Sequence, residues 1–232
     1  MYSSRQQAIF ENRHDAGRQL AEALSEYRGQ SAVILAIPNG GVPVALEVAS
    51  ALETDLDFII CRKIPIIVGS GGSLGAAVDD GTVILNEEVV KKVGFSRQQL
   101  EYEIGKVRAE IKQRSLLYKR DRPPVRVTGK IAILIDDGLA TGFTMVAAVE
   151  SLRQRHPKEI VVAVPVASAM AVKRVEKVAD RVVTCTTGFM PEFYLSDFYR
   201  YWNDLSDDDV VRYLNQWRIR QFRLNIEPPQ NC

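Results

Sequence analysis

Short apolar runs alternate with segments of helical periodicity along most of the chain. The runs cover residues 31–37, 56–61, 131–135, 159–164 and 181–185. Continuous apolar runs of this length are typical of strands buried on both faces, as in parallel sheets. Segments with one apolar face lie between them, near residues 5–27, 42–52, 96–118, 142–155, 168–177 and 206–217. The alternation predicts an α/β protein with an open parallel sheet flanked by helices.

Two segments fit neither periodicity. Residues 69–75 read "GSGGSLG", which predicts a flexible loop over about residues 64–80, with short strands near Ala76 and within residues 82–85. Residues 186–205 are crowded with aromatic side chains.

Composition narrows the class of protein. The chain has 232 residues, of which 46% are hydrophobic and 25% charged, so we expect one soluble globular domain. A net charge of +1 gives no general attraction for nucleic acid or anionic lipid. There is no signal peptide pattern and no run near the roughly 20 apolar residues that span a bilayer. Cys61, Cys185 and Cys232 lack disulfide or zinc spacing, which favours a cytoplasmic location.

The stretch "IAILIDDGLATGFTM", from Ile131 to Met145, carries the main candidate chemistry. Ligands of open α/β sheets bind beyond the carboxyl ends of the strands, where Asp136 and Asp137 lie. Two carboxylates there can accept hydrogen bonds from vicinal hydroxyls or hold Mg²⁺. The compact turn that follows can direct backbone N–H groups at an anion. Together they indicate a sugar phosphate site, although an isolated Asp-Asp pair can also be ordinary turn chemistry.

The string "ILIDDGLATGFTM" resembles the phosphoribosyl pyrophosphate motif of the type I phosphoribosyltransferases. The chain is also similar to bacterial and archaeal phosphoribosyltransferase-domain proteins through "IPNGGVPVALEVA", "VVAVPVAS" and "FYRYWNDLSDDDVV". The resemblance implies that residues 1–232 form one such domain, with a small C-terminal hood over the active site at about residues 186–205.

The resemblance also implies roles for the motif residues. Asp136 and Asp137 would bind the ribose 2′- and 3′-hydroxyls and Mg²⁺. The loop after them would hold the 5′-phosphate, mostly through backbone N–H groups, and consists of Ala140, Thr141, Gly142, Phe143 and Thr144.

The loop after the first strand would contact pyrophosphate and often contains a non-proline cis peptide in this family. Here that loop is Pro38, Asn39, Gly40 and Gly41. Many relatives carry arginine in place of Asn39, so a neutral side chain weakens pyrophosphate capture. Arg62 and Lys63 could supply the missing charge, or could be a solvated strand end. The glycine-rich loop would be the family's lid.

Acceptor recognition is less defined. The 6-oxopurine enzymes have an aspartate where this chain has Ala140, which disfavours hypoxanthine or guanine as the acceptor. Aromatic rings of the hood could stack on a heterocycle, and we expect Phe198 and Tyr199 to do so. Alternatively, these rings close the edge of the core or form a contact in a homodimer.

Three functions compete. The leading hypothesis is an enzyme that transfers ribose 5-phosphate from phosphoribosyl pyrophosphate to a nitrogen nucleophile. The second is a sensor that binds the same ligand without turnover and acts through a partner protein. The third is a phosphoacceptor receiver domain, where paired aspartates bind Mg²⁺; the mid-chain position of the pair and the following "ATGFT" argue against it.

Overall fold

A five-stranded parallel sheet forms the centre of the fold. The computed structural model describes residues 8–66, 73–119, 124–190 and 192–226. The strands are ordered β2-β1-β6-β7-β8 and pair in parallel throughout. Their bounds are Ala32–Ala36 (β1), Asp55–Phe58 (β2), Ile131–Ile135 (β6), Glu159–Ser168 (β7) and Arg181–Gly188 (β8). The predicted fold class is confirmed.

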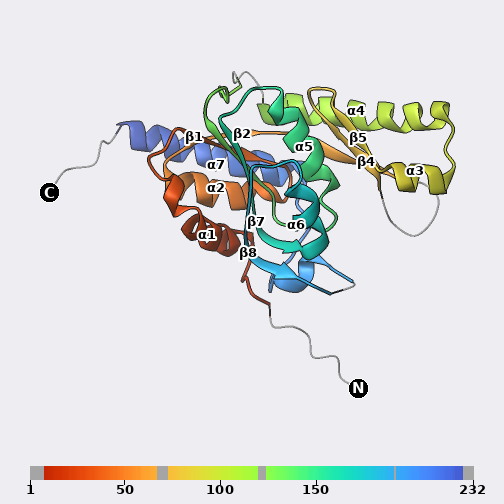
Figure 1. The fold of residues 1–232 in the computed structure, drawn as a ribbon. Helices are drawn as coiled ribbons and strands as arrows, with labels where there is room; N and C mark the ends of the chain where they lie inside the picture. The colour runs from red at the N-terminus through yellow and green to blue at the C-terminus, as the bar shows by residue number, and fades with distance from the viewer. Residues whose placement is uncertain (1–7, 67–72, 120–123, 191, 227–232) are drawn as a thin grey trace.

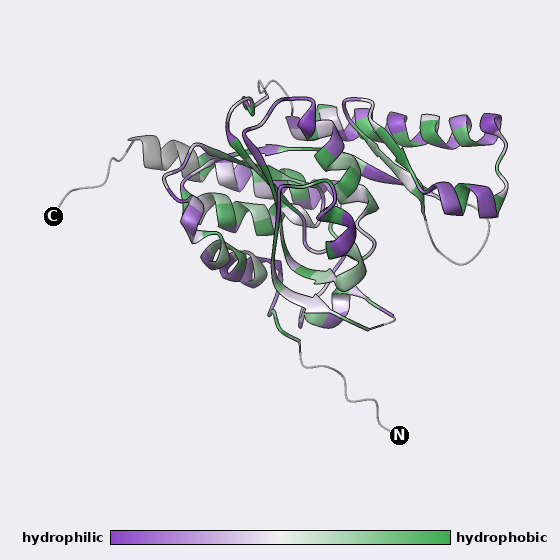
Figure 2. Cartoon of the chain, in the orientation of Figure 1, coloured by the Kyte–Doolittle hydropathy of each residue, from purple (hydrophilic) through white to green (hydrophobic). Residues whose placement is uncertain are grey.

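Helices cover both faces of this sheet (Figure 1). The helices are α1 (Arg13–Ala23), α2 (Gly41–Leu52), α3 (Glu87–Val93), α4 (Arg97–Lys119), α5 (Phe143–Arg153), α6 (Ala169–Val175) and α7 (Asp207–Ile226), with short 3-10 turns η1 (Ser25–Tyr27) and η2 (Leu195–Phe198). Because strand side chains alternate between faces, Ile133 packs toward α1, α2, α4 and α7, whereas Ala132 and Leu134 pack toward α5 and α6. Hydrophobic residues accordingly concentrate in the sheet and on the inner helix faces (Figure 2).

A separate antiparallel sheet extends to one side, beside α3 and α4 (Figure 1). It contains β3 (Cys61–Pro65), β4 (Ser73–Val78) and β5 (Val83–Leu85), in the order β3-β4-β5. The predicted strand over residues 56–61 is confirmed as β2, but its predicted end was wrong: β2 ends at Phe58, and Cys61 already belongs to β3.

The short strands predicted near Ala76 and within residues 82–85 are confirmed as β4 and β5. The described parts of the loop expected over residues 64–80 belong largely to this sheet, and residues 67–72 lie outside the described residues. The described residues differ from the expected loop because glycine can also be required where two strands approach closely. A Cβ on Gly75 would lie 2.0 Å from the carbonyl oxygen of Ile84 on the neighbouring strand. The short helix α3 was also not predicted.

The N-terminal end of the described chain meets the segment that follows β8. Phe10 forms an isolated parallel bridge with Tyr199, and the N–H of Arg200 donates to the carbonyl of Phe10 at 2.8 Å. Phe10, Phe198 and Tyr199 form a small buried cluster with Val166 of β7.

Within the described ranges, none of the helices has the length and apolar character needed to cross a membrane.

Candidate active site

Two adjacent carboxylates follow the carboxyl end of β6, as the sequence predicted. Asp137 is buried and Asp136 is half-buried. The backbone N–H of Asp137 donates to Oδ1 of Asp136 at 2.8 Å, which holds the pair in one conformation. Burial and the charge of Asp137 raise the pKa of Asp136 well above its usual range. Burial also raises the pKa of Asp137, although Arg13 opposes that shift. The pair therefore favours a nearby cation or hydrogen-bond donors.

Arg13 is the partner of Asp137, and the sequence analysis did not identify it. Its Nε donates to Oδ2 of Asp137 at 2.8 Å, and its Nη1 donates to the carbonyl of Asn203 at 2.8 Å. The guanidinium lies 3.8 Å from the centre of the Trp202 ring. Arg13 is 6% exposed. One signal existed in the sequence: Arg13 falls on the apolar stripe of α1 with Leu20, and a charge in such a stripe needs a buried partner.

The turn after the acidic pair forms a cradle of backbone N–H groups. Leu139 donates to the carbonyl of Val166 at 2.9 Å, and its own carbonyl accepts from the N–H of Ser168 at 2.8 Å, so β7 fixes the start of the turn. Within the described part of the chain, the N–H groups of residues 140–144 have no acceptor. Gly142 adopts φ 80°, a left-handed conformation, immediately before α5. The turn thus presents five consecutive donors at a helix N-terminus.

The loop after β1 touches the acidic pair. The Pro38–Asn39 peptide bond is cis, so the expected non-proline cis peptide is confirmed. A Cβ on Gly40 would lie 2.0 Å from Oδ2 of Asp137, and one on Gly41 would lie 2.9 Å from Cα of Asp136. A side chain at either position would collide with the acidic pair, so only glycine fits at positions 40 and 41.

Only part of this loop can donate to an anion. Proline has no N–H, and the N–H of Gly41 already donates to the carbonyl of Ile37 at 3.1 Å. Of the loop's backbone N–H groups, those of Asn39 and Gly40 lack an acceptor among the described residues.

The side chain of Asn39 is committed to a polar network. Its Nδ2 donates to the carbonyl of Leu205 at 2.8 Å and to Oδ1 of Asp207 at 3.1 Å. The same Asp207 oxygen accepts from the Tyr118 hydroxyl at 2.5 Å and from Nε of Arg114 at 3.1 Å. Burial alone would raise the pKa of Asp207, but these donors hold it below its ordinary value. Asn39 therefore ties the loop to α4 and to the start of α7.

Arg62 and Lys63 lie on β3. Nη2 of Arg62 is 3.9 Å from a carboxylate oxygen of Glu110 on α4. Lys63 is exposed, and its charge acts on Asp136 by lowering the pKa of that carboxyl, against the larger effect of burial. Of these two basic residues, Lys63 is the one whose charge acts on the carboxylate of Asp136.

The two aromatic candidates for base stacking are in the core, and that prediction is corrected. Phe198 and Tyr199 are 2% and 4% exposed. The Phe198 ring packs against Phe193 at 5.2 Å, and the Tyr199 ring packs against Phe10 and Trp202 at 5.4 and 5.0 Å. Neither ring offers a free face to a heterocycle. The Tyr199 hydroxyl instead donates to the carbonyl of Asp137 at 2.6 Å, so it fixes the backbone of the acidic pair.

The residues present fit a magnesium ion only together with a ligand. The described residues contain no cluster of three or more His, Cys, Asp or Glu side chains suited to a metal. Asp137 is paired with Arg13, whereas Oδ2 of Asp136 has no partner among the described residues. Mg²⁺ commonly uses one or two carboxylates and takes its other ligands from water and substrate phosphates. Asp136 is thus the better placed of the two to contact it.

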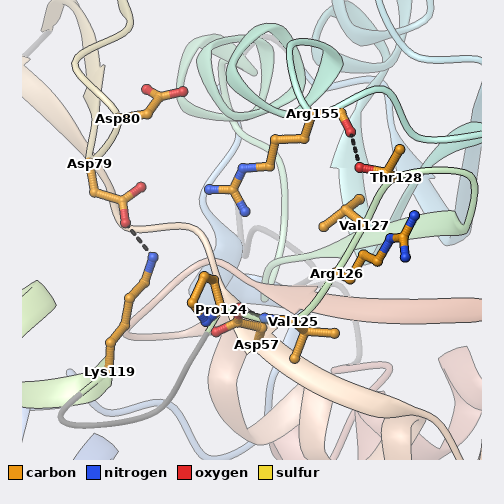
Figure 3. Close-up of a pocket in the computed structure, with 10 residues that line it drawn as sticks. All are labelled: Asp57, Asp79, Asp80, Lys119, Pro124, Val125, Arg126, Val127, Thr128 and Arg155. Atoms are coloured by element: carbon orange, nitrogen blue, oxygen red, sulfur yellow. Dashed lines mark hydrogen bonds and ion pairs between the residues drawn. The ribbon is translucent and has the colours of Figure 1, made fainter.

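A pocket elsewhere in the molecule shares no residue with this site (Figure 3). It has a volume of about 550 Å³, and its charged lining residues are Asp57, Asp79, Asp80, Lys119, Arg126 and Arg155. Lys119 pairs with Asp79 at 2.5 Å, and Asp80 accepts from the Ser151 hydroxyl at 2.5 Å. Acidic and basic groups balance in its described lining, so it lacks the positive field that a polyphosphate needs.

Comparisons with known proteins agree with the fold and the motif. A model of the phosphoribosyl transferase domain matches residues 76–197, more than half of the chain. Two curated Mycobacterium tuberculosis proteins, "Putative phosphoribosyl transferase Rv0571c" of strain H37Rv and "Putative phosphoribosyl transferase MT0597" of strain CDC 1551, are each 36% identical over 208 residues. The match covers 90% of this chain and 47% of theirs, so the chain spans about half the length of these relatives.

A solved structure is similar over nearly its whole length. The crystal structure of TT1426 from Thermus thermophilus has 35% identity and a TM-score of 0.72, covering 90% of this chain and 98% of that one. On the family match, the relatives and the shared fold, the chain belongs to the phosphoribosyl transferase domain family.

Proposed function

We propose that the protein transfers ribose 5-phosphate from phosphoribosyl pyrophosphate to a nitrogen nucleophile and releases pyrophosphate. The observation that carries this proposal is the cradle of five N–H groups, residues 140–144, shortly after the buried Asp137 and the half-buried Asp136. A phosphate monoester suits the cradle, and the hydroxyls of a ribose suit the carboxylates. The Asn39 and Gly40 N–H groups, with Arg62 and Lys63, would contact the pyrophosphate.

In the reaction, the bond between C1 of the ribose and the pyrophosphate oxygen breaks, and pyrophosphate leaves with the electron pair. A nitrogen of the acceptor forms the new bond to C1 and then loses its proton. Positive charge grows on the ribose as the first bond loosens, and the carboxylate of Asp136 favours that charge. Asp136 would hold Mg²⁺, whose chemistry would be to supply positive charge beside the pyrophosphate.

Ala140 and the exposed aromatic side chains bear on the class of acceptor. Ala140 occupies the position where 6-oxopurine enzymes of this family carry an aspartate, so we favour acceptors other than hypoxanthine and guanine. The exposed aromatic side chains Phe189, Tyr194 and Tyr201 replace Phe198 and Tyr199 as candidates for contact with the acceptor or with a second subunit. We further propose one domain over residues 1–232, acting in the cytoplasm.

The second candidate function is a ligand sensor without turnover. It is favoured by Asn39, because its side-chain amide is bonded to Leu205 and Asp207 and carries no charge toward pyrophosphate. A sensor of this kind would bind phosphoribosyl pyrophosphate with Mg²⁺ and transmit the change through a partner protein.

One experiment separates the two functions. The purified protein is incubated with Mg²⁺ and phosphoribosyl pyrophosphate, a panel of nucleobases and amines is added, and pyrophosphate release is measured alongside calorimetric binding. The enzyme predicts release with at least one acceptor, and Asp136→Asn as a control should abolish most of it. Tight binding with no release from any acceptor would establish the sensor. A protein that does not bind the ligand at all would contradict both.

A further inference from the structure

Helix α6 lies directly behind the cradle of N–H groups. Two successive carbonyls of that turn are held from this side. The carbonyl of Ala140 accepts from the Ser168 hydroxyl at 2.7 Å, and the carbonyl of Thr141 accepts from Nη1 of Arg174. A Cβ on Gly142 would be 3.4 Å from Cβ of Ala171, so α6 is in van der Waals contact with the turn.

These two contacts determine where the following N–H groups point. In a planar trans peptide, the C=O and the N–H of the next residue point in opposite directions. Because the Ala140 carbonyl points to Ser168, the N–H of Thr141 points away from α6. In the same way, the Thr141 carbonyl points to Arg174, so the N–H of Gly142 points away from Arg174. Both N–H groups belong to the five that have no acceptor among the described residues.

Both anchoring side chains are themselves fixed. Ser168 is buried and caps α6, accepting from the N–H of Ala171 at 3.0 Å. The guanidinium of Arg174 lies 4.1 Å from the centre of the Phe143 ring, which comes from the turn itself. A planar guanidinium that stacks on a ring and donates to a carbonyl loses little freedom in doing so. The turn is thus held by side-chain contacts from β7 and α6 without a ligand.

We infer that Ser168 and Arg174 are positioning residues that aim the N–H groups of Thr141 and Gly142 at the phosphate monoester of the ligand. The inference rests on the proposed function, because it assigns the cradle to the 5′-phosphate. Arg174 acts through the peptide plane, so its effect should be confined to ligands that carry that phosphate.

Calorimetry with two partial ligands tests this assignment. Ribose 5-phosphate probes the cradle, and pyrophosphate with Mg²⁺ probes the loop after β1. Arg174→Ala should weaken binding of ribose 5-phosphate about tenfold, the loss expected for one hydrogen bond to a charged group, and leave pyrophosphate affinity within about twofold. The matched control is Lys173→Ala, which removes one positive charge from an exposed neighbour on the same helix and should change neither affinity. Arg174→Lys, which keeps a donor, should recover part of the loss.

A spectroscopic measurement on the ligand-free protein isolates the positioning role. The amide resonance of Gly142 should move in Arg174→Ala and stay in place in Lys173→Ala. Unchanged ribose 5-phosphate binding in Arg174→Ala, an equal loss for both ligands, or an equal loss in Lys173→Ala would overturn the inference while leaving the proposed function standing. A wild-type protein that binds neither ligand would overturn the proposed function itself.

Discussion

Nε of Arg13 lies 2.8 Å from Oδ2 of Asp137, and both side chains are almost completely buried. The two residues are 124 positions apart in the sequence. The pair links the first helix to the end of the central strand β6, and through the carbonyl of Asn203 it also reaches the segment before α7. Half of the acidic motif is therefore committed to holding the structure together.

Removal of Arg13 should be strongly destabilising. Arg13→Met leaves the Asp137 carboxylate buried without its cation, and we expect a loss of about 3–5 kcal/mol in the free energy of unfolding, measured in urea. Arg18→Met, on the exposed side of the same helix, should cost less than about 0.5 kcal/mol. If the ion pair is responsible, the double variant Arg13→Met/Asp137→Asn will be more stable than Arg13→Met alone.

Asp136 should combine a catalytic benefit with a cost in stability. Its pKa is raised by burial and by Asp137, so keeping it ionised at neutral pH destabilises the folded state. Asp136→Asn should therefore raise the unfolding midpoint at pH 7 and lower turnover by about 10–100-fold. Parallel denaturation and pyrophosphate-release measurements would check both. A variant that loses stability would show that the ionised carboxylate is well compensated.

Gly142 should tolerate no acidic side chain. It is the residue immediately before α5 and adopts φ 80°, and its N–H belongs to the cradle. Gly142→Asp should abolish binding of phosphoribosyl pyrophosphate, because a carboxylate would repel the phosphate. Gly142→Ala is the matched control for backbone strain, which we expect to cost about 1–2 kcal/mol of stability. Equal calorimetric affinities for Gly142→Asp and wild type would show that the phosphate binds elsewhere.

The Asp207 network should make stability sensitive to acid. Hydrogen bonds from Tyr118, Arg114 and Asn39 lower the pKa of Asp207 despite its partial burial, so the folded state is favoured when Asp207 is ionised. This contribution is fully present above the unfolded pKa of about 4 and is lost as the pH falls through the lower folded value. Asp207→Asn should cost roughly 1–2 kcal/mol at pH 7, allowing for partial exposure.

The gap between wild type and Asp207→Asn should narrow below about pH 4. Asp208→Asn is the control, since Asp208 is an exposed neighbour in the first turn of the same helix. If the difference in the free energy of unfolding between wild type and Asp207→Asn stays constant down to about pH 2, the loss of stability comes from altered packing and not from the charge of Asp207.

Variants of two aromatic residues in the hood, Phe198 and Tyr194, should distinguish a role in core packing from contact with the acceptor. Phe198→Ala should reduce stability by about 3–5 kcal/mol, as expected for a buried ring. Tyr194→Ala removes a ring that is 58% exposed and should change stability by less than about 0.5 kcal/mol. If Tyr194 contacts the acceptor, the KM for the acceptor will rise in that variant alone. Wild-type stability in Phe198→Ala would contradict the packing described here.

The sequence predicted features that depend on local pattern. The apolar runs predicted the strands of the central sheet, and the motif placed Asp136 and Asp137 at the end of β6. It could not predict the side chains that reach the site from distant elements, because periodicity carries no information on which residues pair across the fold. Arg13, Asp207 and Arg174 are ordinary charges in their own segments and acquire a role only when α1, α7 and α6 pack around the two loops. Phe198 and Tyr199 were misassigned for the same reason.

Residues that are far apart in the sequence complete the site, and this has a consequence for how the protein is made. Asn39 finds its partner Asp207 only 168 residues later, and Arg13 reaches Asn203 after 190. Contacts between such distant segments form late, because closing long loops is slow. During synthesis, the acidic pair would leave the ribosome well before the residues that complete its surroundings. We therefore expect a nascent chain that has passed residue 150 to contain most of the binding motif and still be unable to bind its ligand.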